Sequence, residues 1–132
     1  GRYPDAIEAF KQAIRVKAND PDEHNNLGNA YFGLGRYPDA IEAYKQAIRI
    51  RPDFAKVYNN LGNAYGGLGS YQEAMDAFKQ AISIKPDDAL SHLGLGVALL
   101  NIGDKGSAME QYEILKTLDA AMAENLLNMI NK

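Results

Sequence analysis

The sequence contains no cysteine, so it can form neither a disulfide bond nor a thiolate metal site. It also contains no apolar run of about 18 residues, the length that a membrane-spanning helix needs. Its first residues do not form the basic segment followed by an apolar segment that marks a secretory signal. We therefore expect no membrane partner. These absences leave the compartment undetermined, with the cytoplasm favoured.

Basic residues are fewer than acidic ones, with 14 Lys and Arg against 17 Asp and Glu and a net charge of −3. A chain of this charge has no general attraction for nucleic acid or for an anionic membrane, so we expect no nucleic-acid partner. Apolar residues make up 46% of the 132 residues and charged residues 23%. This is an ordinary composition for one globular domain.

The sequence also lacks a set of residues that would support catalysis or bind a cofactor. No nucleophile, base and orienting acid occur together in a recognisable arrangement. Gly-rich stretches such as GLGVALLNIG do not have the spacing of a phosphate-binding loop. His24 and His92 have no second ligand three or four residues further on, so we expect them to pack rather than to bind metal. We predict no catalytic residue, no cofactor and no metal.

What the sequence has in abundance is repetition. The letters GRYPDAIEA occupy residues 1–9 and return at residues 35–43, and looser copies start at Gly69 and Gly103. The copies therefore start at a constant spacing of 34 residues, and residues 1–34 and 35–68 are identical at 23 of 34 positions. A fixed period of this length is typical of a repeat architecture.

Each unit shows the spacing of two helices. One apolar stripe consists of Leu27, Ala30, Tyr31 and Leu34, and a second consists of Ile41, Tyr44 and Ile48. Between the stripes, Gly35 suits the left-handed residue that follows a helix end, and Pro38 suits the start of the next helix. The pattern predicts a helix–turn–helix in each unit.

The repeated pattern resembles the tetratricopeptide repeat, a helix–turn–helix unit of about 34 residues with Leu-Gly, Tyr, Ala, an aromatic residue and Pro at set spacings. One unit supplies His24, Leu27, Gly28, Tyr31, Ala40, Tyr44 and Pro52, and the next supplies Tyr58, Leu61, Gly62, Tyr65, Ala74, Phe78 and Pro86. The last unit is looser, with Leu115 where Ala is usual and Ala120 where Pro is usual. The resemblance implies an all-α fold, a right-handed α-solenoid of antiparallel helix pairs.

The repeat period divides the chain into five parts. These are the second helix of a truncated repeat at 1–20, complete repeats at 21–54 and 55–88, a divergent repeat at 89–118 and a C-terminal capping helix at 119–132. Complete arrays begin and end with a polar cap. Because the first part holds only one helix, we expect the chain to be part of a longer solenoid that lacks its N-terminal end but includes its C-terminal end.

The capping helix is expected from a further run of helical spacing. Its apolar stripe is predicted at Leu118, Met122, Leu126, Met129 and Ile130, and its wet side at Glu124, Asn125, Asn128 and Asn131.

The heptapeptide NNLGNAY occurs at residues 25–31 and again at residues 59–65. Asn in a helix interior costs up to about 0.7 kcal/mol relative to Ala, so its repetition suggests a task. In the family's superhelix, the side of the first helix that bears these residues lines the concave groove. The resemblance therefore implies a peptide-binding groove lined by Asn25, Asn26, Asn29, Asn59, Asn60 and Asn63, with Asp22 and Lys56 at its edge.

A primary amide both donates and accepts hydrogen bonds, so a row of amides can hold the main chain of an extended peptide. A similar asparagine ladder is known along the superhelix of the O-linked N-acetylglucosamine transferase family, which NNLGNAY also resembles. The same amides can instead bond to a neighbouring helix and tie the repeats together, or they can point into solvent. The sequence leaves these alternatives open.

The row of amides ends in the divergent repeat, where the corresponding residues are apolar. We expect Leu90, Leu93 and Val97 to form an apolar groove end, together with Gly94. Three occupants would cover it: a hydrophobic side chain of a ligand, the C-terminal helix, or another copy of the chain. Of these, coverage by the protein itself is the alternative that we favour.

Family members that bind chaperones grip a terminal carboxylate with two Asn residues and three cations. Asn29 and Asn60 match the two amides of this clamp. Asn25, Leu90 and Gly94 stand where the three cations are expected. We therefore predict that this groove does not recognise a terminal carboxylate.

The sequence predicts a non-catalytic protein-interaction scaffold that binds an extended or helical peptide segment in its concave groove, with a protein or peptide as its partner. One alternative is a self-assembling scaffold, a homo-oligomer joined through the exposed solenoid ends. Another is the regulatory arm of a larger enzyme such as a glycosyltransferase. The expected C-terminal cap counts against the enzyme, because in that family the catalytic domain follows the repeats.

Overall fold

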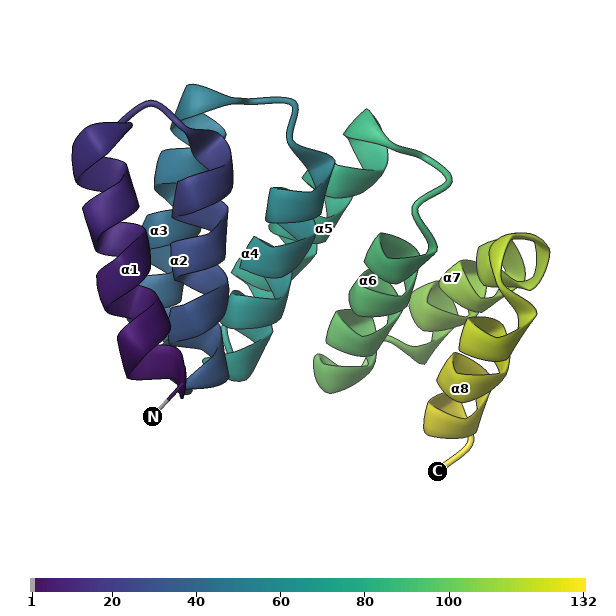
Figure 1. Ribbon diagram of the computed structural model, residues 1–132. Coiled ribbons are helices and arrows are strands. Elements are labelled where there is room, and N and C mark those ends of the chain that lie inside the picture. Colours follow the sequence, from purple (N-terminus) through teal and green to yellow (C-terminus); the bar gives the residue numbers. More distant parts are fainter. Residues whose placement is uncertain (1) are drawn as a thin grey trace.

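The computed structural model describes residues 2–132 and, within that range, consists of eight α-helices and no strand (Figure 1). The helices are α1 (Arg2–Val16), α2 (Pro21–Gly33), α3 (Tyr37–Ile50), α4 (Ala55–Gly67), α5 (Tyr71–Ile84), α6 (Ala89–Asn101), α7 (Lys105–Leu118) and α8 (Ala120–Ile130). This helical solenoid confirms the predicted fold class.

The turns inside the helix pairs have the geometry that their glycines predict. Gly35, Gly69 and Gly103 have φ values of 74°, 77° and 85°, a left-handed conformation that strains any residue with a Cβ. After α2, the N–H of Gly35 bonds to the carbonyl of Phe32 and the N–H of Arg36 bonds to the carbonyl of Tyr31, both at 2.9 Å. These bonds satisfy carbonyls at the helix end and direct the chain back into α3.

The helices form two rows along the solenoid. α2, α4, α6 and α8 follow one another along one side, and α3, α5 and α7 lie behind them (Figure 1). Each helix contacts the next one in the chain, and α8 also contacts α6, as a first helix of a further repeat would. The two ends of the chain lie at opposite ends of the solenoid (Figure 1).

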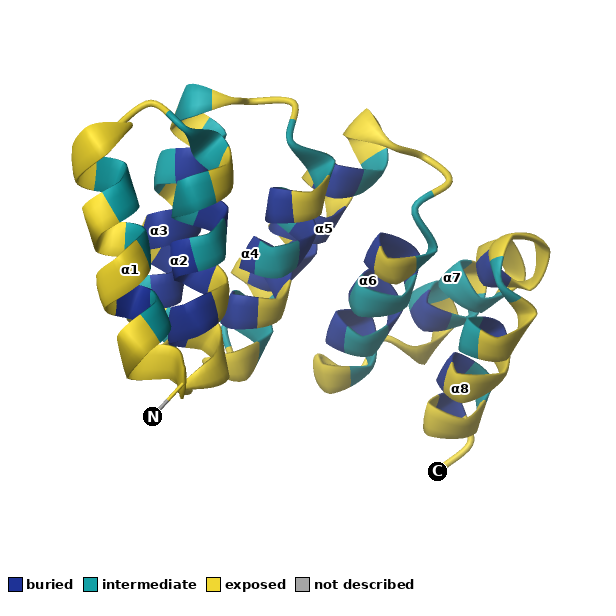
Figure 2. Ribbon diagram, in the orientation of Figure 1, coloured by how far each residue is buried: buried dark blue, intermediate teal, exposed yellow. Residues whose placement is uncertain are grey.

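The core lies between the two rows, where the facing sides of the helices are buried (Figure 2). Aromatic rings pack directly against helix backbone at the Leu-Gly positions. A Cβ added to Gly28 would lie 2.5 Å from Cε1 of Tyr44, so only glycine lets α3 approach α2 this closely. Ala40, which faces the same gap, is 0% exposed. Small residues at these two positions therefore let the two helices of the unit pack closely.

Three residues expected in apolar stripes are exposed. Leu34 is 40% exposed, because it caps the end of α2 and lies beyond its packed face. Leu118 is 36% exposed at the end of α7, and Met129 is 41% exposed. The packed face of α8 is instead a narrow stripe of Ala123, Leu126 and Ile130, while the predicted wet side is exposed as expected.

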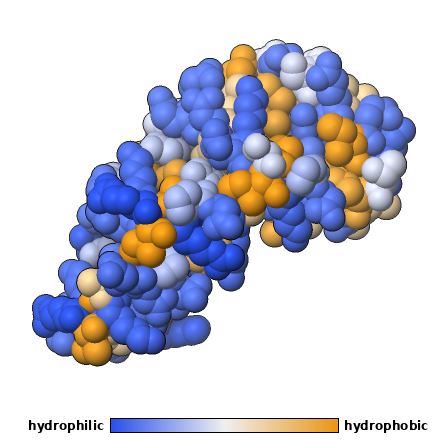
Figure 3. All heavy atoms as spheres, turned by 90° about the horizontal axis from the view of Figure 1, so that it is seen from above, coloured by the Kyte–Doolittle hydropathy of each residue, from blue (hydrophilic) through white to orange (hydrophobic). Residues whose placement is uncertain are grey.

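Seen from above, the surface is mostly hydrophilic, with hydrophobic groups in several areas between the hydrophilic ones (Figure 3). Among residues 2–132, no helix is both long and apolar enough to cross a membrane.

Candidate functional site

The structure divides the six asparagines of the predicted groove into three kinds. All six lie on α2 or α4, at positions related by the repeat. Asn25 and Asn59 are buried, with 3% and 8% of their surface exposed. Asn26 and Asn60 are half-buried, whereas Asn29 and Asn63 are exposed. Their position in the repeat therefore does not give them one common role.

Three of the asparagines take part in two hydrogen bonds between neighbouring repeats. Nδ2 of Asn60 on α4 donates to Oδ1 of Asn25 on α2, at 2.9 Å. Nδ2 of Asn59 on α4 donates to Oγ of Ser91 on α6, at 3.2 Å. The Ser91 hydroxyl in turn donates to Oδ2 of Asp88, at 2.7 Å. Side-chain bonds thus connect three successive first helices, and they satisfy polar groups that burial would otherwise penalise.

These bonds involve residues that were predicted to line the groove. Asn25 and Asn59 are buried and their side chains bond across to a neighbouring first helix, although Asn59 also lines the pocket described below. For them the structural alternative, in which amides tie the repeats together, describes the observed contacts. Ser91 was missed by the sequence analysis. The repeat pattern could have identified Ser91. The residue 34 positions earlier is the buried Val57, and a buried hydroxyl in its place needs a hydrogen-bond partner.

Asn29 and Asn63 keep amide groups at the surface. Oδ1 of Asn29 accepts a hydrogen bond of 2.7 Å from the Tyr44 hydroxyl, which fixes the side chain and directs its NH₂ group away from that contact. Burial raises the pKa of Tyr44, which favours the neutral hydroxyl that donates this bond. Nδ2 of Asn63 lies 3.5 Å from Oδ1 of Asn59, at the limit of a hydrogen bond. Of the amides that form a contact, Asn63 therefore has the weakest hydrogen bond.

The residues predicted at the groove edge are solvent-exposed. Lys56 and Asp22 both lie in the first turn of their helices, α4 and α2. The side chain of Asp20 caps α2 by accepting a hydrogen bond from the backbone N–H of Asp22. The Asp22 carboxylate takes no part in this cap.

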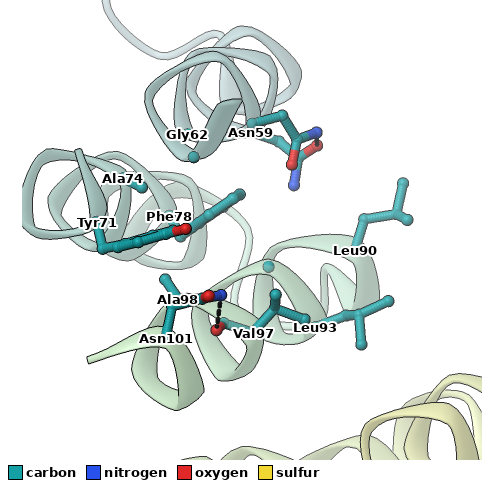
Figure 4. A pocket seen from close by; sticks show the side chains of 13 residues that line it. Asn59, Gly62, Tyr71, Ala74, Phe78, Leu90, Leu93, Val97, Ala98 and Asn101 are labelled. Carbon is teal, nitrogen blue, oxygen red and sulfur yellow. Dashed lines mark hydrogen bonds between the residues drawn. The ribbon is translucent and has the colours of Figure 1, made fainter. Parts of the chain in front are cut away.

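A pocket of about 320 Å³ lies among α4, α5 and α6 (Figure 4). Leu90, Leu93 and Val97, the predicted apolar groove end, all line it. The pocket is completed by Asn59, Gly62, Asn63, Gly66, Tyr71, Ala74, Phe78, Gly94, Ala98 and Asn101, and none of its lining residues is charged. The structure therefore brings the apolar residues of α6 together with two amides of α4.

The C-terminal helix does not line this pocket, whereas coverage by another copy of the chain, the other form of the alternative favoured from the sequence, stays a prediction. Leu90 is 54% exposed, and the lining residues come from α4, α5 and α6 alone. The C-terminal helix α8 lies on α6 and α7, and none of its residues lines the pocket. α8 packs beside α6 and α7, where the first helix of a further repeat would lie. It therefore does not cover the pocket, which lies among α4, α5 and α6.

The Phe78 ring forms one side of the pocket and is held between two helix backbones. A Cβ added to Gly62 on α4 would lie 2.7 Å from the ring, and a Cβ on Gly94 of α6 would also overlap it. Two glycines thus fix the ring in place. The Phe78 side of the pocket is therefore tightly packed.

Both histidines contact other groups of the protein, and His92 is buried. His92 is 5% exposed, and its Nδ1 and Nε2 lie 2.8 Å from Oε1 of Gln111 and from the carbonyl of Pro86. Nε2 of His24 lies 3.1 Å from the carbonyl of Ala18. Among residues 2–132, no group of three or more His, Cys, Asp or Glu residues is arranged to hold a metal ion.

Comparison with known proteins identifies structural relatives. A crystal structure of MamA superimposes with a TM-score of 0.86 at 27% identity, covering 94% of this chain and 72% of that one. The TPR2B domain of yeast Sti1 in complex with an Hsp70 peptide has a TM-score of 0.80 at 24% identity, covering 84% and 95%. The first TPR domain of Spaghetti (RPAP3) bound to the HSP90 peptide SRMEEVD has a TM-score of 0.80 at 23% identity, covering 84% and 90%. No curated protein matches the chain.

Family models match more than half of the sequence. A model described as TPR repeat matches residues 1–35 and 28–69, and one described as tetratricopeptide repeat matches residues 55–88. Such repeats are generally non-catalytic modules for protein interaction. The helix pairs, the glycine turns and these matches agree, and the chain belongs to the tetratricopeptide repeat family.

Proposed function

We propose that this chain is a non-catalytic interaction module whose concave groove, along α2, α4 and α6, binds a peptide segment of a partner protein. The observation that carries the proposal is the uncharged pocket of about 320 Å³ beside the exposed amide of Asn63. Pockets that combine apolar walls with a few polar groups are the usual form of a binding site. Two proteins of similar fold are known in complex with peptides, which supports the same use of the groove.

The amides support this role by contacting the main chain of the peptide. Asn29 and Asn63 occupy equivalent positions on successive first helices and are exposed at the surface. An extended peptide that passes both would offer carbonyls and N–H groups to the two amides. Asn25, Asn59 and Asn60 act differently in this proposal, because their contacts join the repeats and hold the groove in shape.

The groove is not suited to a terminal carboxylate. Leu90 and Gly94 occupy two positions at which a carboxylate clamp carries cations, and Asn25 occupies the third and is buried. A negative charge bound there would lose water without gaining a cationic partner. The peptide therefore binds through an internal, uncharged segment.

The experiment uses peptides selected against the protein from a random heptapeptide display library. Asn63→Ala is expected to weaken their binding about fivefold or more, because it removes an exposed amide from the groove. Asn128→Ala is the matched control, since Asn128 is exposed on α8. Equal affinity for Asn63→Ala and Asn128→Ala would contradict a role for the groove amide. Self-assembly through the solenoid ends and attachment to an enzyme remain predictions from the sequence alone.

A further inference from the structure

The repeat formed by α4 and α5 lacks an aromatic ring that the preceding repeat has at the equivalent position. In the repeat formed by α2 and α3, the Phe32 ring packs edge-on against Tyr37, with 5.3 Å between centroids and 67° between planes. The residues 34 positions later are Gly66 and Tyr71. This repeat therefore keeps the tyrosine but lacks the phenylalanine that packs on it.

The space that a side chain would take at Gly66 is empty. A Cβ added to Gly66 would meet no atom within 4 Å, whereas one added to Gly62, a turn earlier in α4, would overlap the Phe78 ring. Gly66 and Tyr71 both line the pocket among α4, α5 and α6. The pocket therefore includes the place that a ring like that of Phe32 would occupy in this repeat.

The shape and size of the pocket fit a side chain. Its volume of about 320 Å³ lies at the small end of ligand sites, which span roughly 300–1,000 Å³. Tyr71 and Phe78 offer ring faces and edges, and aromatic pairs prefer edge-to-face or offset contacts with centroids about 4.5–7 Å apart. Because Gly62 and Gly94 hold the Phe78 ring, that ring cannot move in to fill the space itself.

The rim of the pocket carries amides and no charge. Asn63 is exposed on α4, and Nδ2 of Asn101 on α6 donates to the carbonyl of Val97 at 2.9 Å, which leaves its own Oδ1 as an acceptor (Figure 4). These groups can bond to peptide N–H and C=O groups on either side of an inserted side chain. A charged residue at the same place would lose water without a compensating partner.

We propose that this pocket binds an aromatic side chain from an uncharged peptide segment, which replaces in trans the ring that Phe32 supplies in cis to the preceding repeat. The proposal rests on the proposed function and adds the side chain that determines specificity. The main chain of the segment lies across Asn63 and Asn101, and its ring packs against Tyr71 and Phe78.

The direct test uses N-acetyl-L-phenylalaninamide, which carries one ring and two amide groups. Titrated to millimolar concentration, it is expected to shift the NMR signals of Tyr71, Leu93 and Val97. Gly66→Phe fills the pocket from within and should weaken this binding at least tenfold, whereas Gly66→Ala, which leaves the pocket open, should not. N-acetyl-L-asparaginamide should produce no such shifts.

Val97→Asn gives a second way to close the pocket to a ring, because it introduces the residue that the preceding repeat has at Asn63. It makes one wall polar and should weaken the binding of N-acetyl-L-phenylalaninamide as well. Shifts that survive both Gly66→Phe and Val97→Asn would overturn the proposal, as would equal shifts from the asparagine compound.

Failure of this inference can be told apart from failure of the proposed function. Heptapeptides selected from the random library are expected to contain Phe, Tyr or Trp at one fixed position and to bind Gly66→Phe at least tenfold more weakly. Selected peptides that need Asn63 but contain no common aromatic residue would overturn the pocket proposal alone. Peptides that bind outside α2, α4 and α6 would overturn both.

Discussion

Asn60 and Asn25 are joined by a hydrogen bond of 2.9 Å, although they are 35 residues apart and lie on different repeats. Asn25 is 3% exposed, so its Oδ1 has little access to water and depends on this donor. A bond between two first helices fixes their relative position. The arrangement of the first helices along the groove therefore depends in part on this bond.

Asn25→Ala is expected to destabilise the protein by about 1–3 kcal/mol, because it leaves the half-buried amide of Asn60 without its acceptor. Asn26→Ala is the control on the same helix. That change improves helix propensity at a less buried position, so its effect should be small or slightly stabilising. Urea unfolding of both variants gives the comparison. Equal loss of stability in the two variants would contradict the assigned role of the Asn25–Asn60 bond.

Ser91→Val is expected to destabilise by about 1–2 kcal/mol, since it removes the acceptor of the buried Asn59 amide. The repeats themselves supply the compensating change. Val57 precedes Ser91 by 34 residues, and Leu93 follows Asn59 by the same interval. The double variant Asn59→Leu with Ser91→Val replaces both partners by apolar residues and should recover most of the lost stability. Thermal unfolding of the single and double variants measures the coupling, and simple additivity would argue against it.

Tyr44→Phe is expected to change how stability depends on alkaline pH. Burial raises the pKa of Tyr44 above its ordinary value of 10.0, so the unfolded chain loses this proton at lower pH than the folded protein does. The resulting stabilisation is complete below pH 10 and decreases as the pH rises above it. The variant lacks this group, and its stability should fall less steeply between pH 9.5 and about 11.5.

At neutral pH the same variant should be less stable by about 0.5–1.5 kcal/mol, because the bond from Tyr44 to Asn29 is lost. It should still fold, since Phe78 occupies the equivalent position in the next repeat. Urea unfolding at a series of pH values tests both statements. Parallel pH profiles for the variant and the natural protein would rule out the contribution of Tyr44.

Gly62 and Gly66 lie four residues apart on α4 and should respond in opposite ways to substitution by Ala. Gly66→Ala is expected to stabilise by up to about 1 kcal/mol, because it improves helix propensity and its Cβ enters open space. Gly62→Ala should destabilise by about 1–3 kcal/mol, since its Cβ would lie 2.7 Å from the Phe78 ring. Stabilisation by both changes in thermal unfolding would show that α4 and α5 are not packed this tightly.

Much of the fold could be predicted from the sequence because it depends on local rules. Gly35 marks a turn since only glycine adopts its left-handed conformation without strain, and the spacing of Ile41 and Tyr44 marks the buried side of α3. The stripe of α8 was predicted less well. Met129 has helical spacing but lies beside the narrow contact with α6 and α7, which depends on how the helices approach one another.

The site could be predicted only in part, for a similar reason. The apolar groove end at Leu93 and Val97 was readable as a change in residue type at fixed repeat positions. The split between buried Asn25 and exposed Asn29 was not readable, because both lie on α2 at the spacing of one turn, and that spacing does not show which of them bonds to α4. The pocket at Gly66 was readable in principle, by comparison with Phe32, but was not predicted.

The measurement that tests the account most directly is NMR mapping of a library-selected heptapeptide on the isotopically labelled protein. The account predicts that the largest shifts fall on the groove side of α4 and α6, around Asn63, Tyr71 and Val97, and that they vanish in Gly66→Phe. Largest shifts on the outer face of α3 and α5, around Glu42 and Lys79, would contradict it.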